Sequence, residues 1–111
     1  MEGQARDYSA VDSLEKARAL CSAGKLELLY MLPLEFGGLK VPANTLYVPP
    51  GIAAIKASID RTIQEMVNAG QVAAYEAKPE YKGNSFVPSK IIISASHPKK
   101  EGGLNPIINV W

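Results

Sequence analysis

Apolar residues recur every three or four positions in two stretches of the chain, which is the spacing of an amphipathic helix. We expect the first helix over residues 9–23 and the second over residues 52–69. A glycine follows each stretch, Gly24 after the first and Gly70 after the second, and glycine readily adopts the left-handed conformation that ends a helix. The polar residues of the second stretch are expected to face solvent, and they are Lys56, Asp60, Arg61, Gln64 and Glu65.

The segments outside these helices have the apolar and β-branched composition of strands. Three of them are expected to end at Pro33, Pro49 and Pro79, because proline cannot donate a hydrogen bond to a strand ladder. Short connections favour antiparallel pairing, so the sequence predicts an α+β fold: a largely antiparallel sheet of about five strands with two helices on one face. The expected strands cover residues 25–32, 41 or 44 to 48, 71–78, 89–96 and 106–111.

The two halves of the chain resemble each other when one is shifted by 46 residues. The matched residues are mostly glycines and prolines, which occupy the positions where backbone geometry is most constrained. We predict a single domain over residues 1–111 with a duplicated helix-strand-strand unit, at approximately 5–50 and 51–96, and an extra C-terminal strand at 106–111. The alternative is a coincidence between two ordinary helix-glycine-strand segments. The matched pairs are Ala23-Gly24 with Ala69-Gly70, Pro33 with Pro79, Gly37 with Gly83, and Val41-Pro42 with Val87-Pro88.

The expected strands carry apolar residues on both faces. In the first strand, Leu28 and Tyr30 alternate with Leu29 and Met31, so neither face is polar. Helices on one side of a sheet cannot cover its other side, and monomers seldom leave wide apolar patches in water. We therefore expect the second face to meet another copy of the chain in a homodimer, or to bind another protein. Alternatively, the loops at 33–43 and 97–106 fold over that face.

Composition and charge exclude several classes of protein. The chain has 111 residues, of which 47% are hydrophobic and 21% are charged, as is typical of one globular domain. Its 12 Lys and Arg residues against 11 Asp and Glu give a net charge of +1, which argues against a nucleic-acid partner. The beginning of the chain has no uninterrupted apolar stretch, so we expect no membrane contact and a cytoplasmic location, unless an export signal once preceded Met1.

Few residues suggest catalysis or a metal site. His97 is the only histidine, and Cys21, the only cysteine, lies on the apolar stripe of the first helix. We therefore expect no catalytic residue, no cofactor and no metal ion. If the chain were a simple acid-base enzyme, Glu27 or Glu76 would be its base, because both lie among apolar strand neighbours.

The start of the second helix is the best candidate for an anion site. The first backbone N–H groups of this helix are free after Gly51, and Lys56 lies about one turn further on. The alternative is an ordinary helix start that binds no ligand.

Aromatic residues and lysines near predicted turns are the best candidates for a contact surface, because aromatic side chains anchor interfaces and polar ones form the rim. We expect a non-enzymatic protein-binding or inhibitor module, similar in size and charge to toxin-neutralising immunity proteins. The alternative is a small-ligand binder or a simple acid-base enzyme with a pocket between sheet and helices. The candidate contact residues are Phe36, Tyr47, Tyr81, Phe86, His97, Lys99, Lys100 and Trp111.

Overall fold

The computed structural model describes residues 7–111 and confirms the α+β class. Helix α1 spans Leu14–Ser22 and helix α2 spans Ile52–Asn68. Between the helices lie strand β1 at Glu27–Tyr30, two short 3₁₀ helices, η1 at Leu34–Phe36 and η2 at Pro42–Asn44, and strand β2 at Thr45–Val48. After α2 come β3 at Ala74–Tyr81, β4 at Pro88–His97, β5 at Lys100–Leu104 and β6 at Ile107–Asn109.

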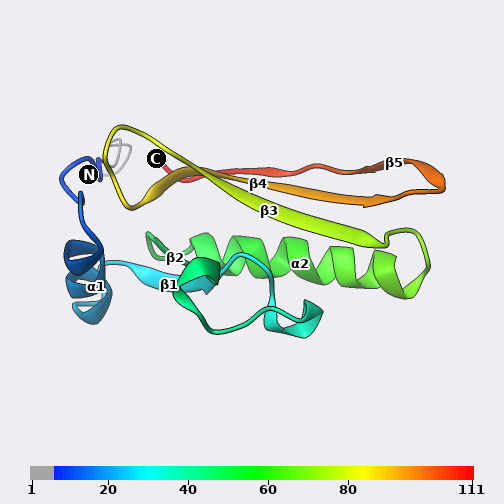
Figure 1. The fold of residues 1–111 in the computed structure, drawn as a ribbon, viewed down its shortest axis with the longest axis horizontal. Helices are drawn as coiled ribbons and strands as arrows, with labels where there is room; N and C mark the ends of the chain where they lie inside the picture. The colour runs from blue at the N-terminus through cyan, green and yellow to red at the C-terminus, as the bar shows by residue number, and fades with distance from the viewer. Residues whose placement is uncertain (1–6) are drawn as a thin grey trace.

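The strands form two separate antiparallel sheets, so the prediction of one sheet of about five strands is wrong. β1 pairs with β2, and the four later strands form a second sheet with β4 at its centre (Figure 1). β3 lies on one side of β4, whereas β5 and β6 follow each other along its other side. β5 lies where the sequence predicts a polar loop. Its residues have little strand propensity of their own, so tertiary pairing with the edge of β4 decides their conformation.

Helix α2 lies along one face of the four-stranded sheet and shares an apolar core with it (Figure 1). Ile63 of α2 and Ile91 and Ile93 of β4 are fully buried in this core. The two-stranded sheet packs beside α2 and adds Leu29 and Leu46. α1 packs at one end of the molecule around a second, smaller apolar cluster. The prediction that both helices lie on one face of the same sheet is therefore wrong.

The opposite face of the four-stranded sheet, called the outer face below, is mostly polar. Strand alternation turns Ile91 and Ile93 into the core and Ile92 to the outer face, where it stands opposite Ile107. The exposed apolar strand face expected from the sequence is therefore not the outer face of the four-stranded sheet. The other residues that these pairings place on the outer face are Ala74, Glu76, Lys78, Glu80, Lys90, Ser94, Ser96 and Asn109.

The two helices end in the same way, at positions that the 46-residue shift superimposes. Gly24 and Gly70 have φ angles of 77° and 74°. After each glycine, the next N–H donates at 2.8 Å to a carbonyl in the last turn of the helix, that of Leu20 or of Met66. The surrounding elements differ in size, because α1 has 9 residues against 17 in α2, and β1 has 4 against 8 in β3. The duplicated unit therefore stays a prediction.

Strand β3 runs through Pro79, where the sequence predicts that a strand ends. This prediction is wrong because β3 pairs with β4 alone among the described strands, and an edge strand tolerates a proline. A proline on a free edge also hinders pairing with a further strand. The β3 edge is therefore poorly suited to join two copies of the chain.

Candidate functional site

One side of the two-stranded sheet is left open. Strand alternation turns Leu29 of β1 into the core and its neighbours the opposite way. Leu28 stands opposite Tyr47, and Tyr30 opposite Thr45, across the two strands. These four side chains form the floor of a groove.

Three other parts of the chain form the walls of this groove, which has a volume of about 430 Å³. They are α1, the segment that leads into β2, and the end of β3 with the turn after it. Residues from both halves of the chain therefore meet in one place, which we call the β1–β2 groove. The wall residues are Leu14, Arg18, Lys40, Val41, Pro42, Tyr81 and Phe86.

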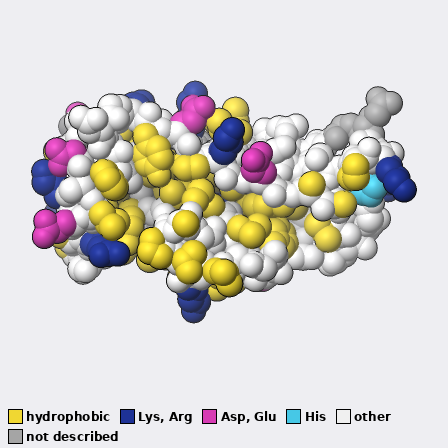
Figure 2. Space-filling view, in the orientation of Figure 1, with side chains coloured by type: hydrophobic (Ala, Val, Ile, Leu, Met, Phe, Trp, Pro, Cys, Tyr) yellow, Lys and Arg dark blue, Asp and Glu magenta, His cyan; other side chains and the backbone are white. Residues whose placement is uncertain are grey.

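Large apolar side chains in the groove are exposed to solvent. Leu28, Tyr81 and Phe86 are 42%, 47% and 44% exposed, and Val41 is 40% exposed. Figure 2 shows hydrophobic side chains clustered over the part of the molecule that holds β1 and β2 and continuing along its middle. Single exposed apolar residues are normal on any protein, but a contiguous group in a groove is typical of a binding surface.

Both charged residues of the groove are cations. Arg18 of α1 and Lys40 are exposed, and no carboxylate is found among the described residues that line the groove. Burial raises the pKa of the Tyr81 phenol, so this hydroxyl stays protonated at neutral pH. The groove thus combines an apolar floor with positive charge and hydrogen-bond donors.

Three of the contact residues predicted from the sequence, Tyr47, Tyr81 and Phe86, come together in the β1–β2 groove. Sequence reasoning missed Leu28 and Tyr30, which lie beside them. The signal that points to both residues is the first strand with apolar side chains on its two faces. Only the structure shows which of these faces is open.

Two other predicted contact residues are packed within the chain. The ring of Phe36 meets that of Tyr75 edge to face, with centroids 5.1 Å apart. Trp111 meets Tyr8 in the same way at 5.9 Å, and its Nε1 donates to the carbonyl of Val87 at 2.9 Å. Phe36 and Trp111 therefore both contribute to packing.

The predicted basic contact residues, His97, Lys99 and Lys100, lie where β4 turns into β5, at the opposite end of the molecule from the groove (Figure 1). The Nζ of Lys100 donates to the carbonyl of Gly70 at 2.9 Å. The backbone N–H of Lys99 donates to Nδ1 of His97 at 3.0 Å. The Lys100 contact holds the β4–β5 turn against the end of α2, whereas the His97 contact is internal to the turn.

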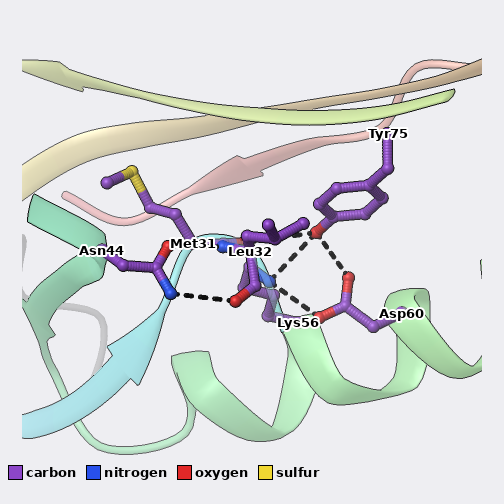
Figure 3. Close-up of polar contacts among 6 residues, drawn as sticks. All are labelled: Met31, Leu32, Asn44, Lys56, Asp60 and Tyr75. Atoms are coloured by element: carbon purple, nitrogen blue, oxygen red, sulfur yellow. Dashed lines mark hydrogen bonds and ion pairs between the residues drawn. The ribbon is translucent and has the colours of Figure 1, made fainter. Parts of the chain in front are cut away.

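A buried polar network connects α2 with β3 (Figure 3). The Nζ of Lys56 donates to Oδ2 of Asp60 at 2.7 Å and to the Tyr75 hydroxyl at 3.1 Å. The Tyr75 hydroxyl in turn donates to Oδ1 of Asp60 at 2.7 Å. The side chains of Lys56 and Asp60 are only 3% and 15% exposed. The prediction that both face solvent is therefore wrong, because the end of β1 and Tyr75 cover this flank of α2 (Figure 3).

This network stabilises the fold and is a poor candidate for catalysis. Burial, and next the hydrogen bond with Asp60, raise the pKa of Tyr75, so its phenol does not titrate near neutral pH. Among the described residues, every buried side-chain nitrogen and oxygen atom has a hydrogen-bond partner. A general acid or base needs a pKa near the working pH, which Tyr75 lacks.

The predicted anion site at the start of α2 is filled by the chain itself. Gly51 precedes the helix and has no side chain that could cap it. Oε2 of Glu27, from β1, accepts the backbone N–H groups of Gly51 and Ala53, each at 3.0 Å. Lys56 points to Asp60 instead. Glu27 is therefore the helix cap, which accounts for a carboxylate among apolar neighbours.

Replacing Glu27 by alanine is expected to lower the free energy of unfolding by about 1 kcal/mol, because two helix N–H groups lose their acceptor. Chemical denaturation measures the change. Glu76→Ala is the control, since Glu76 lies exposed on the outer face and should change stability far less. Equal effects of the two substitutions would contradict the capping role of Glu27.

Among the described residues, histidine, cysteine and carboxylate side chains form no group of three or more that could hold a metal ion. The described helices are too short or too polar to cross a lipid bilayer. Comparisons with protein-family models, with curated proteins and with solved structures find no match.

Proposed function

We propose that this protein is a non-enzymatic module that binds another protein through the β1–β2 groove. One observation carries the proposal: exposed apolar side chains from α1, β1 and the β3–β4 turn converge on this groove. These side chains leave water only when a partner covers them. Tyr81 and Phe86 belong to the residue types that most often anchor interfaces or add apolar contact area.

The floor of the groove is supported by the main apolar core. This floor belongs to strands whose other side is buried, through Leu29, Leu46 and Val48, in the main apolar core. A partner therefore meets a surface that is already formed, and little conformational entropy is lost in ordering it.

The catalytic alternative has no comparable support. Neither Glu27 nor Glu76 lines the groove, because Glu27 caps α2 and Glu76 lies on the outer face. Among the described lining residues there is also no histidine. General acids and bases are most often histidine or a carboxylate, and the described lining offers a lysine and tyrosines instead.

A second copy of this chain is one partner that the proposal allows. The outer face offers Ile92 and Ile107 among charged neighbours, which is a small apolar area for a stable dimer. A homodimer would therefore form through the groove. An inhibitor role of the immunity type would follow if the partner were an enzyme.

Selection from a phage-displayed library of random peptides on the immobilised full chain tests the proposal. We expect peptides that bind the unmodified protein, bind Ile107→Ala equally and lose most of their binding with Phe86→Ala. Phe86 and Ile107 are 44% and 54% exposed, so both variants should fold, and they differ in the surface that they alter. Peptides that bind Phe86→Ala as well as the unmodified protein would contradict the assignment of the groove.

A further inference from the structure

We infer that the β1–β2 groove takes a peptide segment of its partner in which apolar side chains are flanked by carboxylates. This inference rests on the function proposed above and adds the chemistry of the partner. Arg18 and Lys40 line the groove from two separate parts of the chain, and the described lining contains no carboxylate. An acidic side chain in the groove would thus meet two cations and no like charge, which is the complementarity that selects partners.

Among the described residues, two cations outside the groove have a carboxylate partner. Lys16 pairs with Asp12 and Lys56 with Asp60, each at 2.7 Å. Among the side chains that the structure describes, no carboxylate pairs with Arg18 or Lys40. The described carboxylates thus leave this charge to a ligand, although the whole chain carries a net charge of only +1.

The hydroxyl groups of the groove favour the same ligand. Thr45 already donates its hydroxyl to the carbonyl of Val41 at 2.8 Å. The phenols of Tyr30, Tyr47 and Tyr81 are further hydrogen-bonding groups among the described lining residues. Together with a guanidinium and an ammonium group, they give a groove rich in donors. Carboxylates accept several hydrogen bonds at once, so they match this lining.

A single-stranded nucleic acid also combines negative charge with flat groups that stack on aromatic rings, but the groove suits it less. Such ligands need a track of cations along their backbone, whereas two cations line this groove. Leu14, Leu28 and Val41 form aliphatic parts of the lining, and these suit side chains better than bases. We therefore argue for a peptide and use nucleic acid as a competing outcome.

Charge reversal on the full chain tests this inference. In the peptide selection above, the unmodified protein is expected to enrich peptides that contain Asp or Glu beside apolar residues. The double variant Arg18→Glu with Lys40→Glu should bind those peptides about tenfold more weakly at low salt and should enrich peptides containing Lys or Arg instead. The matched control is Lys78→Glu with Lys99→Glu, which changes the net charge equally on exposed positions outside the groove and should leave the selection unchanged.

The outcomes separate this inference from the proposed function. Peptides that depend on Phe86 but show no acidic preference, or that bind the charge-reversed variant unchanged, would overturn the inference and leave the protein-binding function standing. A selection without peptides that depend on Phe86 would overturn both. Binding of random single-stranded RNA that the Arg18 and Lys40 reversal abolishes, or a dimer in sedimentation that Phe86→Ala dissociates, would also overturn the inference.

Discussion

Replacing Lys56 by alanine is expected to lower the free energy of unfolding by about 3 kcal/mol, because a buried carboxylate loses its cation. Asp60 is 15% exposed and keeps one hydrogen bond, from the Tyr75 hydroxyl. Its other oxygen loses the ammonium group, and a carboxylate that is mostly withdrawn from water is costly without a cation. Chemical denaturation of the two proteins, with both midpoint and slope compared, measures the loss.

Lys16 provides a matched control for this substitution. It also forms an ion pair of 2.7 Å with an aspartate four residues away, Asp12, but both side chains are more than half exposed, at 58% and 51%. Lys16→Ala should therefore leave the free energy of unfolding almost unchanged. The two pairs share their length and sequence spacing, so the contrast between the variants reports burial.

A double variant separates the loss of the pair from the burial of a lone charge. Lys56→Met with Asp60→Leu removes both charges and fills their space with apolar atoms, which should restore most of the stability. The Tyr75 hydroxyl keeps a contact of 3.4 Å with the carbonyl of Met31. Equal losses for Lys56→Ala and Lys16→Ala would instead mean that water reaches Asp60 freely in solution.

The helices are predictable from sequence because their signals lie within the helix itself. α2 is expected over 52–69 and is found at Ile52–Asn68, since its apolar stripe and Gly70 are local features. α1 begins later than its expected range of 9–23, because the Ser13 hydroxyl accepts the N–H of Lys16 and caps the helix there.

The arrangement of the strands is not predictable in this way, because strand pairing is decided between distant segments. The sequence identifies β4 as a strand rich in isoleucine but does not show that it lies at the centre of a sheet. It likewise does not show that β1 and β2 pair only with each other. The single sheet expected from the sequence is therefore two sheets.

The candidate site is predicted in part for the same reason. Tyr47, Tyr81 and Phe86 are found in one groove, but Phe36 has the same kind of sequence neighbourhood and is packed on Tyr75. An aromatic residue near a turn indicates apolar contact area. The amino-acid sequence does not show whether that area packs within the chain or contacts another molecule. Lys56 illustrates the converse, because helical periodicity assigns it to solvent although another layer of the fold covers it.

Replacing Ile91 by alanine is expected to lower the free energy of unfolding by about 4 kcal/mol, whereas Ile92→Ala should cost about 1 kcal/mol. Ile91 is fully buried in the main core, so its truncation leaves a cavity there. Ile92 faces the outer face and stands opposite Ile107. Both substitutions remove the same atoms at adjacent positions of β4, so the difference in their effects, measured by denaturation, reports burial.

This contrast tests the register of β4, on which the groove depends. Side chains alternate along a strand, so a shift of one residue would bury Ile92, expose Ile91 and transfer the larger loss to Ile92→Ala. Leu29 and Leu46 share the core with Ile91, and the strands that carry them, β1 and β2, form the groove floor. Ile91→Ala should therefore also weaken the binding of groove-dependent peptides, while Ile92→Ala leaves it unchanged. Equal losses of stability for the two variants would contradict the assignment of the core and of the floor that it supports.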